Sequence, residues 1–491
     1  MSHLRPAPLL TRRQALAGLG AVGLCAFRAG PVCSDASARA ARFGLGDLSS
    51  VALREVGTPA FLDALAPERS LPPASVLKVM TTLYALDALG PSHRFRTELR
   101  ALGAIEGDTL RGGLVLVGGG DPVLDANALR GLATSLAETG LTKIEGSFLV
   151  ADGALPFIAQ VDATQPLHVG YNPAISGLNL NFNRVRVEWE PGEGKPRFRF
   201  VAPGQDFRVA IAGIGGELGS APPPVHRMQD MREIWTLPGP RMKGRGGLWL
   251  PVRQPSVHAG EVFRKLCAER GITLPDAEIV AEAPEGATIA AHESWQLRDI
   301  LKGMLRYSTN LTAEIVGLHA SKARGLAPAT LADSASGMTA WARERYGLET
   351  ADFTDHSGLS DRSRWSAAET VRVLDAEADG DLPELLRAQV LTDEEGRPIQ
   401  ASHVEAVAKT GTLYFAGGLA GYLQTTDRRL AFAIYSADLD RRAAIPQPAP
   451  EAPPGSRGWA GRARGFQREI LSEWVRDYLP KPHLRPRARP G

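Results

Sequence analysis

Cysteine is scarce in this chain, which has three cysteines in 491 residues. Two of them, Cys25 and Cys33, lie in or beside a predicted export signal, so the mature chain would keep only Cys267. A single cysteine excludes an intramolecular disulfide. Neither Cys25 nor Cys33 follows the small residue that a lipoprotein signal would need.

Net charge and aromatic residues are also in short supply. A formal charge of +2 does not suggest a nucleic-acid partner. Aromatic residues make up only 6% of the chain, and its 52 glycines and 36 prolines indicate turns and loops rather than a helical bundle. The hydrophobic content of 44% and the charged content of 22% are ordinary for a globular protein. The length allows two to four domains of roughly 150 residues each.

The N-terminus is typical of an export signal. Paired arginines, Arg12 and Arg13, precede a mildly apolar segment from Ala15 to Phe27, and two A-x-A cleavage motifs follow. This segment is too short and too rich in glycine and alanine for a stable transmembrane span. The arginines resemble a twin-arginine signal, and a Sec signal is the alternative. We expect an exported, periplasmic protein with its signal in residues 1–40 and a mature start near residues 39–41.

The most informative stretch is the apolar run from Val76 to Leu89, which Gly90 and Pro91 end. A helix this apolar is buried on most sides, so its polar positions need an explanation. Ser75 and Lys78 are three residues apart and share one face of the predicted helix. The sequence therefore predicts a hydroxyl and an amine side by side in the first turn of a buried helix.

That pair suits nucleophilic catalysis. A serine hydroxyl becomes reactive when a base takes its proton. Lys78 can be the base, because burial and the positive end of the helix dipole both disfavour its charged form. The alternative is a capping serine with a lysine that reaches the surface. The apolar helix and the lack of a second S-x-x-K in the chain favour catalysis.

The middle of the chain predicts strands and two helices without chemical motifs. A strand over residues 112–117 leads into a glycine loop that lacks the G-x-G-x-x-G and G-K-[ST] patterns of phosphate sites, so we expect a turn there. Asp125 is the predicted cap of a helix that ends at Gly140. Residues 176–236 read as short antiparallel strands, and residues 257–271 as a helix.

Two more polar clusters occur near the ends of predicted elements. A helix that starts near Trp295 ends at Tyr307, and a second helix follows at once with Asn310 as its expected N-cap. Taken alone, Ser308 and Asn310 would mean turn and cap chemistry only.

The second cluster lies in a strand predicted for residues 405–412, with hairpin partners at 417–424 and 430–435. It contains Lys409, Thr410 and Gly411. Glycine weakens a strand but lets a ligand approach the backbone closely. The alternative is an exposed edge strand with an incidental glycine.

The three motifs S-x-x-K, S-x-N and K-T-G occur in this order at Ser75, Ser308 and Lys409. This set closely resembles that of class A β-lactamases and penicillin-binding proteins. A compact β-lactamase has no room for the long separation between Ser75 and Ser308. The chain instead resembles the penicillin-binding D-alanyl-D-alanine carboxypeptidases/endopeptidases of low-molecular-mass class C, whose transpeptidase-like domain is split by a large insertion.

The resemblance implies an α+β fold, a β-lactamase/transpeptidase-like domain with an antiparallel sheet flanked by helices, split by a β-rich insertion. The catalytic domain would comprise residues 41–98 and 291–479, and the insertion residues 99–290. The Pro/Arg-rich tail, residues 480–491, is predicted to be disordered. Further stretches that match the family are Gly118–Pro122, Asn179–Asn183 and Asp355–Ser360. Two departures are residues 393–397, where the family often has Gly-Thr-Leu, and His356, where it usually has a small residue.

The resemblance also implies roles for individual residues. Ser75 would be acylated, Lys78 would accept its proton, and Ser308 and Lys409 would relay a proton to the leaving amine. Asn310 would hydrogen-bond the amide of the acyl side. The remaining residues implied for substrate binding and the oxyanion hole are Thr410, Gly411 and Thr412. No metal or cofactor is implied, and the ten histidines show no ligand spacing.

The expected function is that of an exported serine DD-peptidase. It would cleave D-Ala-D-Ala termini and D-Ala-diaminopimelate crosslinks of peptidoglycan through an acyl-enzyme, and bind penicillin covalently. The expected partners are peptidoglycan stem peptides and β-lactam antibiotics, and the oligomeric state is open. The alternatives are a serine β-lactamase, for which no water-activating glutamate is evident, and a catalytically weak peptidoglycan-binding protein of the same fold. Binding alone would not need the full set of motif residues.

Overall fold

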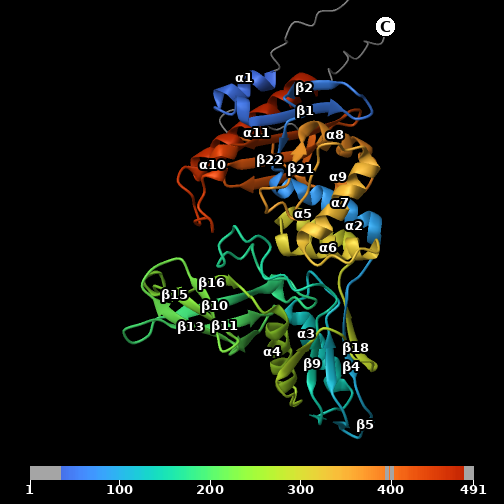
Figure 1. Cartoon of the computed structure of the whole chain (residues 1–491), viewed down its shortest axis with the longest axis vertical. Coiled ribbons are helices and arrows are strands. Elements are labelled where there is room, and N and C mark those ends of the chain that lie inside the picture. Colours follow the sequence, from blue (N-terminus) through green and yellow to red (C-terminus); the bar gives the residue numbers. More distant parts are fainter. Residues whose placement is uncertain (1–34, 393–396, 399–402, 480–491) are drawn as a thin grey trace, which may run out of the picture.

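The computed structural model describes residues 35–392, 397–398 and 403–479. The predicted tail, most of the predicted export signal and nearly all of the segment 393–397 lie outside these residues. Figure 1 shows an elongated molecule in which the two ends of the described chain contribute to one large sheet and its helices. The middle of the chain forms a separate group of sheets below them. We call these two parts the main module and the inserted module.

The main module is built on a six-stranded sheet in the order β2-β1-β23-β22-β21-β20, with every neighbouring pair antiparallel. The N-terminal hairpin lies beside strands from the far end of the chain, because β1 pairs with β23 along its whole length. The strands are β1 (Ser49–Glu55), β2 (Phe61–Leu65), β20 (Arg387–Ala388), β21 (Glu405–Leu413), β22 (Ala416–Gln424) and β23 (Arg429–Ala437).

Helices cover both faces of this sheet. One face packs against a group of helices around the buried α2, and residues of β1, β22 and β23 share a hydrophobic core with them. The other face packs against α11 and α1 through a second core. The helices of the first group are α2 (Lys78–Leu89), α5 (Leu297–Tyr307), α6 (Asn310–Ala323), α7 (Leu331–Tyr346) and α8 (Ala367–Ala376). The helices of the second are α1 (Asp35–Arg42) and α11 (Ser456–Tyr478).

The inserted module begins and ends in one sheet. Its five strands lie in the order β17-β9-β7-β4-β18, and β4 and β18, which carry the chain out of and back to the main module, are paired. Helices α3 and α4 pack on this sheet, and a core separate from those of the main module fills the space. These elements are β4 (Arg96–Ala101), β7 (Leu114–Val117), α3 (Ala126–Glu138), β9 (Phe148–Ala151), α4 (Pro255–Ala268), β17 (Ala277–Val280) and β18 (Ala287–Glu293).

Three smaller sheets complete the inserted module, and one of them consists of the short strands β5 (Ile105–Glu106), β6 (Thr109–Leu110) and β8 (Lys143–Ile144). The other two are larger. One has the order β12-β11-β10-β16 and the other β13-β15-β14. The prediction of short antiparallel strands is confirmed for most of these pairs, but β13 and β15 are parallel. The strands are β10 (Arg184–Glu190), β11 (Arg197–Pro203), β12 (Arg208–Ile211), β13 (Ile214–Gly219), β14 (Val225–Gln229), β15 (Arg232–Pro238) and β16 (Gly246–Pro251).

Local signals in the sequence account for several of these elements. Asp125 caps α3, as predicted, because its side chain accepts the backbone N–H of Ala128 at 2.9 Å. The glycine loop after β7 packs closely against the backbone of β4. A Cβ on Gly119 would lie 2.0 Å from the carbonyl oxygen of Arg96, so only glycine fits there. Within the described ranges, no helix is both long enough and apolar enough to cross a bilayer.

Candidate active site

Ser75 lies in a strained turn where three segments meet. The residues Ala74–Leu77 form a 3₁₀ turn that runs directly into α2, so the predicted α-helical first turn is a 3₁₀ turn instead. Ala74 has a φ of 48°, which a residue with a Cβ rarely adopts. Gly358 presses against it, and a Cβ there would lie 1.9 Å from the carbonyl oxygen of Ala74. Backbone strain of this kind gathers at functional sites.

Lys78 is fully buried and has three polar neighbours. Its Nζ lies 3.0 Å from Ser75 Oγ, 2.8 Å from Asn310 Oδ1 and 2.6 Å from the carbonyl oxygen of Ser357. Neither the amide oxygen nor the carbonyl can donate a hydrogen. A neutral amine would therefore donate to these two oxygens and turn its lone pair towards the Ser75 hydroxyl. This arrangement lets Lys78 receive the Ser75 proton.

Burial also adjusts the proton affinity of Lys78. Removal from water lowers the pKa of its amine to about 8, although the negative charges of Asp355 and Glu314 oppose the change. An amine with this pKa is partly neutral near neutral pH, as a general base needs to be.

Two buried carboxylates hold the loop behind Lys78. Glu314 accepts the backbone N–H groups of His356 and Ser357 at 3.0 and 2.9 Å. Asp355 accepts those of Gly358 and Ser360 at 2.8 and 2.7 Å. Burial raises the pKa of both carboxyls, whereas these donors favour their charged forms. Together they fix the carbonyl of Ser357 where Lys78 meets it.

Ser308 and Lys409 form a second serine–lysine pair. Ser308 is the C-cap that follows α5 and has the left-handed conformation, with a φ of 58°. Lys409 is 2% exposed, and its Nζ lies 3.0 Å from Ser308 Oγ and 2.6 Å from the carbonyl oxygen of Thr410. Burial lowers the pKa of Lys409 well below its usual value, and the positive charges of Lys78 and Arg387 lower it further.

Asn310 connects the two modules. Its Oδ1 accepts from Lys78, and its Nδ2 donates to the carbonyl oxygen of Tyr171 at 3.0 Å. The prediction that Asn310 is an N-cap is wrong, because Thr309 holds the cap position and Asn310 is the first helical residue of α6. Because the Asn310 side chain does not cap the helix, it can contact Lys78 and Tyr171 instead.

The strand β21 lies against the Ser75 turn because it carries glycine. A Cβ on Gly411 would lie 2.8 Å from the carbonyl oxygen of Pro73 and 3.0 Å from the N of Ser75. The β20 strand pairs only with Val407 and Ala408, whereas Thr410 and Thr412 are exposed. Within the described chain, the segment from Lys409 onwards thus borders the cleft with no strand paired to it on that side.

His356 is accommodated by a matching glycine. The imidazole is fully buried, and a Cβ on Gly317 would lie 2.2 Å from its ring. Its Nε2 lies 2.8 Å from Ser334 Oγ, and burial lowers its pKa to about 3. The larger residue that sets this chain apart from the expected pattern is therefore a neutral, packed side chain behind the site.

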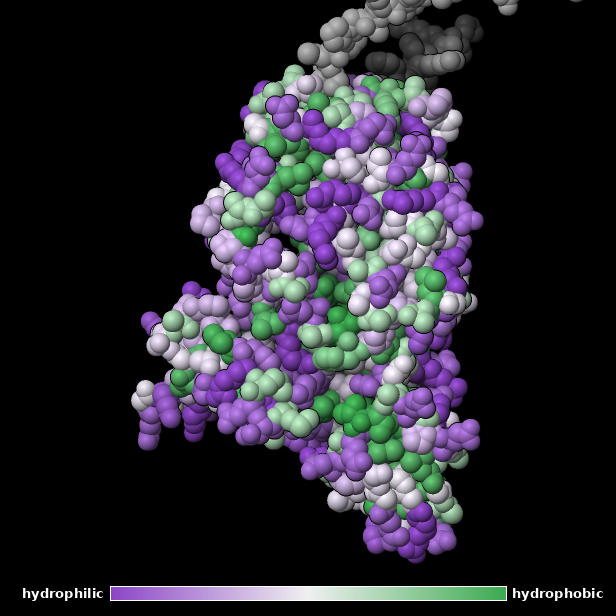
Figure 2. All heavy atoms as spheres, in the orientation of Figure 1, coloured by the Kyte–Doolittle hydropathy of each residue, from purple (hydrophilic) through white to green (hydrophobic). Residues whose placement is uncertain are grey.

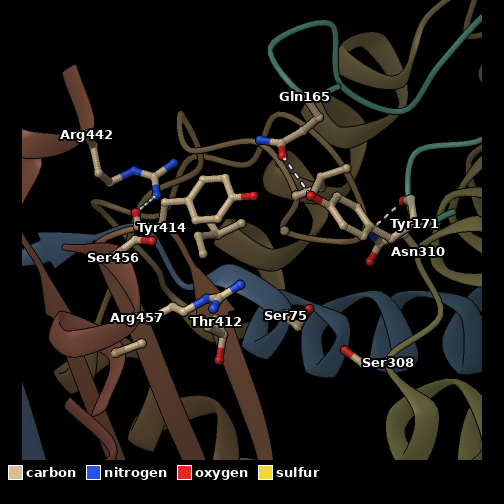
Figure 3. Close-up of a pocket in the computed structure, with 14 residues that line it drawn as sticks. Ser75, Gln165, Tyr171, Ser308, Asn310, Thr412, Tyr414, Arg442, Ser456 and Arg457 are labelled. Carbon is tan, nitrogen blue, oxygen red and sulfur yellow. Dashed lines mark hydrogen bonds between the residues drawn. The ribbon is translucent and has the colours of Figure 1, made fainter. Parts of the chain in front are cut away.

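A cleft of about 400 Å³ opens beside Ser75 and is lined by both modules. Figure 3 shows Ser75, Ser308 and Thr412 along one side, with Gln165 and Tyr171 of the inserted module opposite. The sequence did not single out Gln165, Tyr171, Tyr414, Arg442 or Arg457, which also line the cleft. These residues belong to no recognised motif and come from loops and strand ends. Among the described residues, no cluster of three or more His, Cys, Asp or Glu side chains could hold a metal.

The structure brings all eight predicted site residues to this region. Five form the two lysine-centred groups, and the other three belong to the β21 segment beside them. Glu314 could have been suspected from the sequence, since it stands one helical turn after Asn310 and is the only charged residue between Leu311 and Leu318.

Comparison with known proteins gives one consistent result. The model of the "D-Ala-D-Ala carboxypeptidase 3 (S13) family" matches residues 37–449. A D-alanyl-D-alanine carboxypeptidase from Actinomadura sp. (strain R39) is 26% identical over 470 residues, which cover 88% of this chain and 87% of the relative.

The solved structure of penicillin binding protein 4 (dacB) from Haemophilus influenzae has the same fold. It superposes with a TM-score of 0.70 at 19% identity and covers 89% of this chain and 99% of that protein. Another structure of that protein, complexed with a β-lactam, superposes with a TM-score of 0.67. This confirms the predicted fold class. The family match, which spans most of the sequence, shows that the chain belongs to the S13 family of serine D-Ala-D-Ala carboxypeptidases.

Proposed function

We propose that this protein is a DD-peptidase that cuts both D-Ala-D-Ala termini and D-Ala-diaminopimelate crosslinks of peptidoglycan through an acyl-enzyme on Ser75. The observation that carries the proposal is the buried Ser75–Lys78 pair, with 3.0 Å between Oγ and Nζ, beside the Ser308–Lys409 pair. Family membership supports the class of reaction.

In the first half-reaction, Ser75 Oγ attacks the carbonyl carbon of the penultimate D-alanine, and its proton passes to the neutral amine of Lys78. The carbonyl oxygen becomes an oxyanion beside the backbone N–H groups of Ser75 and Thr412. Donors in such positions typically contribute ~10²–10³ in rate. The C–N bond then breaks and leaves an ester on Ser75.

The departing amine needs a proton. Ser308 Oγ, 3.0 Å from Lys409 Nζ, can deliver one and be resupplied by the lysine. Before the second half-reaction, Lys78 gives up the proton that it took from Ser75 and Lys409 regains one, which restores both lysines. Lys78 then takes a proton from a water molecule as the water attacks the ester carbon, and it returns this proton to Ser75 Oγ as the ester bond breaks. A penicillin ring that acylates Ser75 would stay attached for as long as this second step is slow.

Both substrates present the same recognition group. Lys409 supplies a cation when it is protonated, and Thr410 and Thr412 of β21 supply exposed hydroxyl groups. A terminal D-alanine carries a carboxylate next to the scissile bond, and so does the D-centre of a crosslinked diaminopimelate. A carboxylate accepts such donors well. The strand itself would pair with the peptide backbone by strand addition.

The structure bears on where an export signal would be removed. The A-x-A motifs of residues 36–40 fall within α1, where Ala36 and Ala40 are buried and Arg39 pairs with Glu473 of α11. A cut at residues 39–41, as the sequence predicts, would divide this helix. We propose export to the periplasm with removal of a segment that ends before Asp35. N-terminal sequencing of the periplasmic protein tests both statements.

The activity is tested with two substrates. Purified protein should release D-alanine from a pentapeptide and split crosslinked muropeptide dimers, and Ser75→Ala should abolish both reactions. Lys409→Ala should slow both together, because both leaving groups carry the same carboxylate. Loss of one activity with the other intact would contradict the shared recognition. Rapid turnover of penicillin without release of D-alanine would point to a β-lactamase instead.

A further inference from the structure

Large aromatic side chains are exposed beside the cleft, next to the segment that carries Asn310. Trp295 and Tyr307 are 70% and 72% exposed, and Trp249 is 39% exposed. Trp295 precedes α5 and Tyr307 ends it, whereas Trp249 belongs to β16 of the inserted module. Apolar side chains that gather at one place on the surface mark a binding site, because their exposure to water is unfavourable.

These side chains line two hollows. The first adjoins the cleft, and the second adjoins the first. The first has about 390 Å³ and shares Tyr171, Ser308 and Asn310 with the cleft. The second has about 790 Å³, lies between α3 and α5, and shares Tyr307 and Phe182 with the first. Pockets of ~300–1,000 Å³ hold small ligands. We call the two hollows together the aromatic groove. Figure 2 shows hydrophobic residues gathered where the two modules meet.

Buried polar atoms at the groove lack partners. Thr312 lines the second hollow, is 1% exposed, and its hydroxyl has no hydrogen-bond partner in the described part of the chain. His292 lines the same hollow, with its Nε2 3.9 Å from Asp121 Oδ2, a buried oxygen that also lacks a hydrogen bond there. Such atoms are costly unless a ligand or water binds them. An acyl chain would leave the Thr312 hydroxyl unpaired, whereas a ligand rich in hydroxyls would pair with it.

The first hollow has a similar mixed character. The guanidinium of Arg184 lies 5.5 Å from the ring centre of Phe182 and 5.4 Å from that of Trp249. Both rings and the cation line the hollow. The groove therefore offers flat apolar faces together with hydrogen-bond donors. A sugar ring fits this combination, because one face carries C–H groups and the edge carries hydroxyl groups.

We propose that the aromatic groove binds the amino-sugar strand to which the stem peptide is attached, while the peptide lies in the cleft at Ser75. This inference rests on the proposed function, since it assigns a place to the saccharide part of the same substrate. Ser308 and Asn310 line both the cleft and the groove, so the two form one continuous surface. A saccharide joined to the peptide would fill both, whereas an unrelated ligand would not need this connection.

The first test compares two substrates that differ only in the sugar. Release of D-alanine is measured for a pentapeptide and for the same peptide on a GlcNAc–MurNAc disaccharide. We expect kcat/KM to be about tenfold higher with the disaccharide, and the Trp295→Ala/Trp249→Ala double variant to bring the ratio close to one. Phe61→Ala, at an exposed aromatic of β2 on the far edge of the main sheet, should keep the wild-type ratio.

The second test measures binding without catalysis. Peptide-free GlcNAc–MurNAc is titrated into protein already acylated by benzylpenicillin, and tryptophan fluorescence is followed. Binding should persist with the cleft blocked and weaken about tenfold in Trp295→Ala, which should still be acylated by penicillin if it is folded. Equal kcat/KM for the two substrates, or disaccharide binding that Trp295→Ala leaves unchanged, would overturn the groove proposal alone. Failure to release D-alanine from either substrate would overturn the proposed function, and the titration would still decide the groove.

Discussion

Glu314 Oε1 accepts the backbone N–H of Ser357 at 2.9 Å and thereby fixes the carbonyl that meets Lys78 Nζ at 2.6 Å. The second oxygen of the same carboxylate holds His356. The orientation of Lys78, the proposed general base, thus depends on a residue outside the cleft lining. Glu314 is a positioning residue, and its removal should affect acylation as well as stability.

Glu314→Gln replaces one acceptor oxygen with an amide N–H₂ that faces a backbone donor. We expect the free energy of unfolding to fall by ~1–3 kcal/mol and acylation by penicillin to slow roughly 10- to 100-fold. Because the charge of Glu314 raises the pKa of Lys78, its loss should also move the rising limb of the pH–rate profile to lower pH. Stopped-flow acylation across pH measures both effects.

Glu369→Gln is the matched control. Glu369 is also buried, at 3% exposure, and accepts the backbone N–H groups of Glu349 and Thr350 at 2.7 Å each. It should lose less stability, because both N–H groups bind the same oxygen and the new amide N–H₂ can donate to the Thr350 hydroxyl, and its acylation rate and pH profile should stay as in the wild type. If the two variants had the same pH–rate profile of acylation, the role of Glu314 would be purely structural.

We expect Lys78 to govern the pH dependence of acylation. Only the neutral amine can accept the Ser75 proton, and its pKa is lowered to about 8. The acylation rate should therefore rise with pH and level off above about 8. Lys78→Arg should be acylated very slowly at every pH, since arginine keeps its charge. Near-normal acylation in that variant, measured by a fluorescent penicillin, would remove Lys78 as the base.

Gly411 should tolerate no side chain. In Gly411→Ala the new methyl group would meet the carbonyl oxygen of Pro73 at 2.8 Å and push β21 away from Ser75. We expect acylation to fall by roughly 10²-fold, since small displacements of a catalytic geometry have effects of this size. Gly417, on the neighbouring strand, is the control, because its nearest atom would lie 3.6 Å from the new methyl group. If Gly417→Ala were slowed as much as Gly411→Ala, close approach would not be the reason.

Asp121 should make stability depend on pH. Burial raises the pKa of this carboxyl to about 7 in the folded chain, above its ordinary 3.8, so the folded state binds the proton more tightly. Its contribution to stability is complete below the ordinary value and is lost as pH rises through 7. Asp121→Asn should therefore gain stability over the wild type between pH 4 and 7, by at most about 4 kcal/mol. Urea denaturation at pH 5 and pH 8 measures the difference, and an equal difference at both would contradict the assignment.

The sequence predicted the parts of the site that lie within one element. The S-x-x-K, S-x-N and K-T-G residues follow from spacing on a buried helix, at a helix end and on a strand, and the structure brings these residues together. The 3₁₀ turn at Ser75 was missed, because it depends on Gly358 and Gly411 pressing from distant segments. Local propensity carries no information about such contacts.

Contacts between distant residues also explain the other omissions. Tyr171 reaches Asn310 from a loop of the inserted module, with its backbone carbonyl, and a carbonyl has no signature in the sequence. His356 could be noted as unusual, but only the fold shows that Gly317 gives it space. The N-cap was misplaced by one residue, since Thr309 and Asn310 are both common at helix starts.

The proposed reaction depends on acylation of Ser75. The most direct measurement is the mass spectrum of the intact protein after treatment with benzylpenicillin, followed by peptide mapping. We expect one penicillin per chain, attached to the peptide that contains Ser75, and no adduct in Ser75→Ala. An adduct on another residue, or labelling that persists in Ser75→Ala, would contradict it.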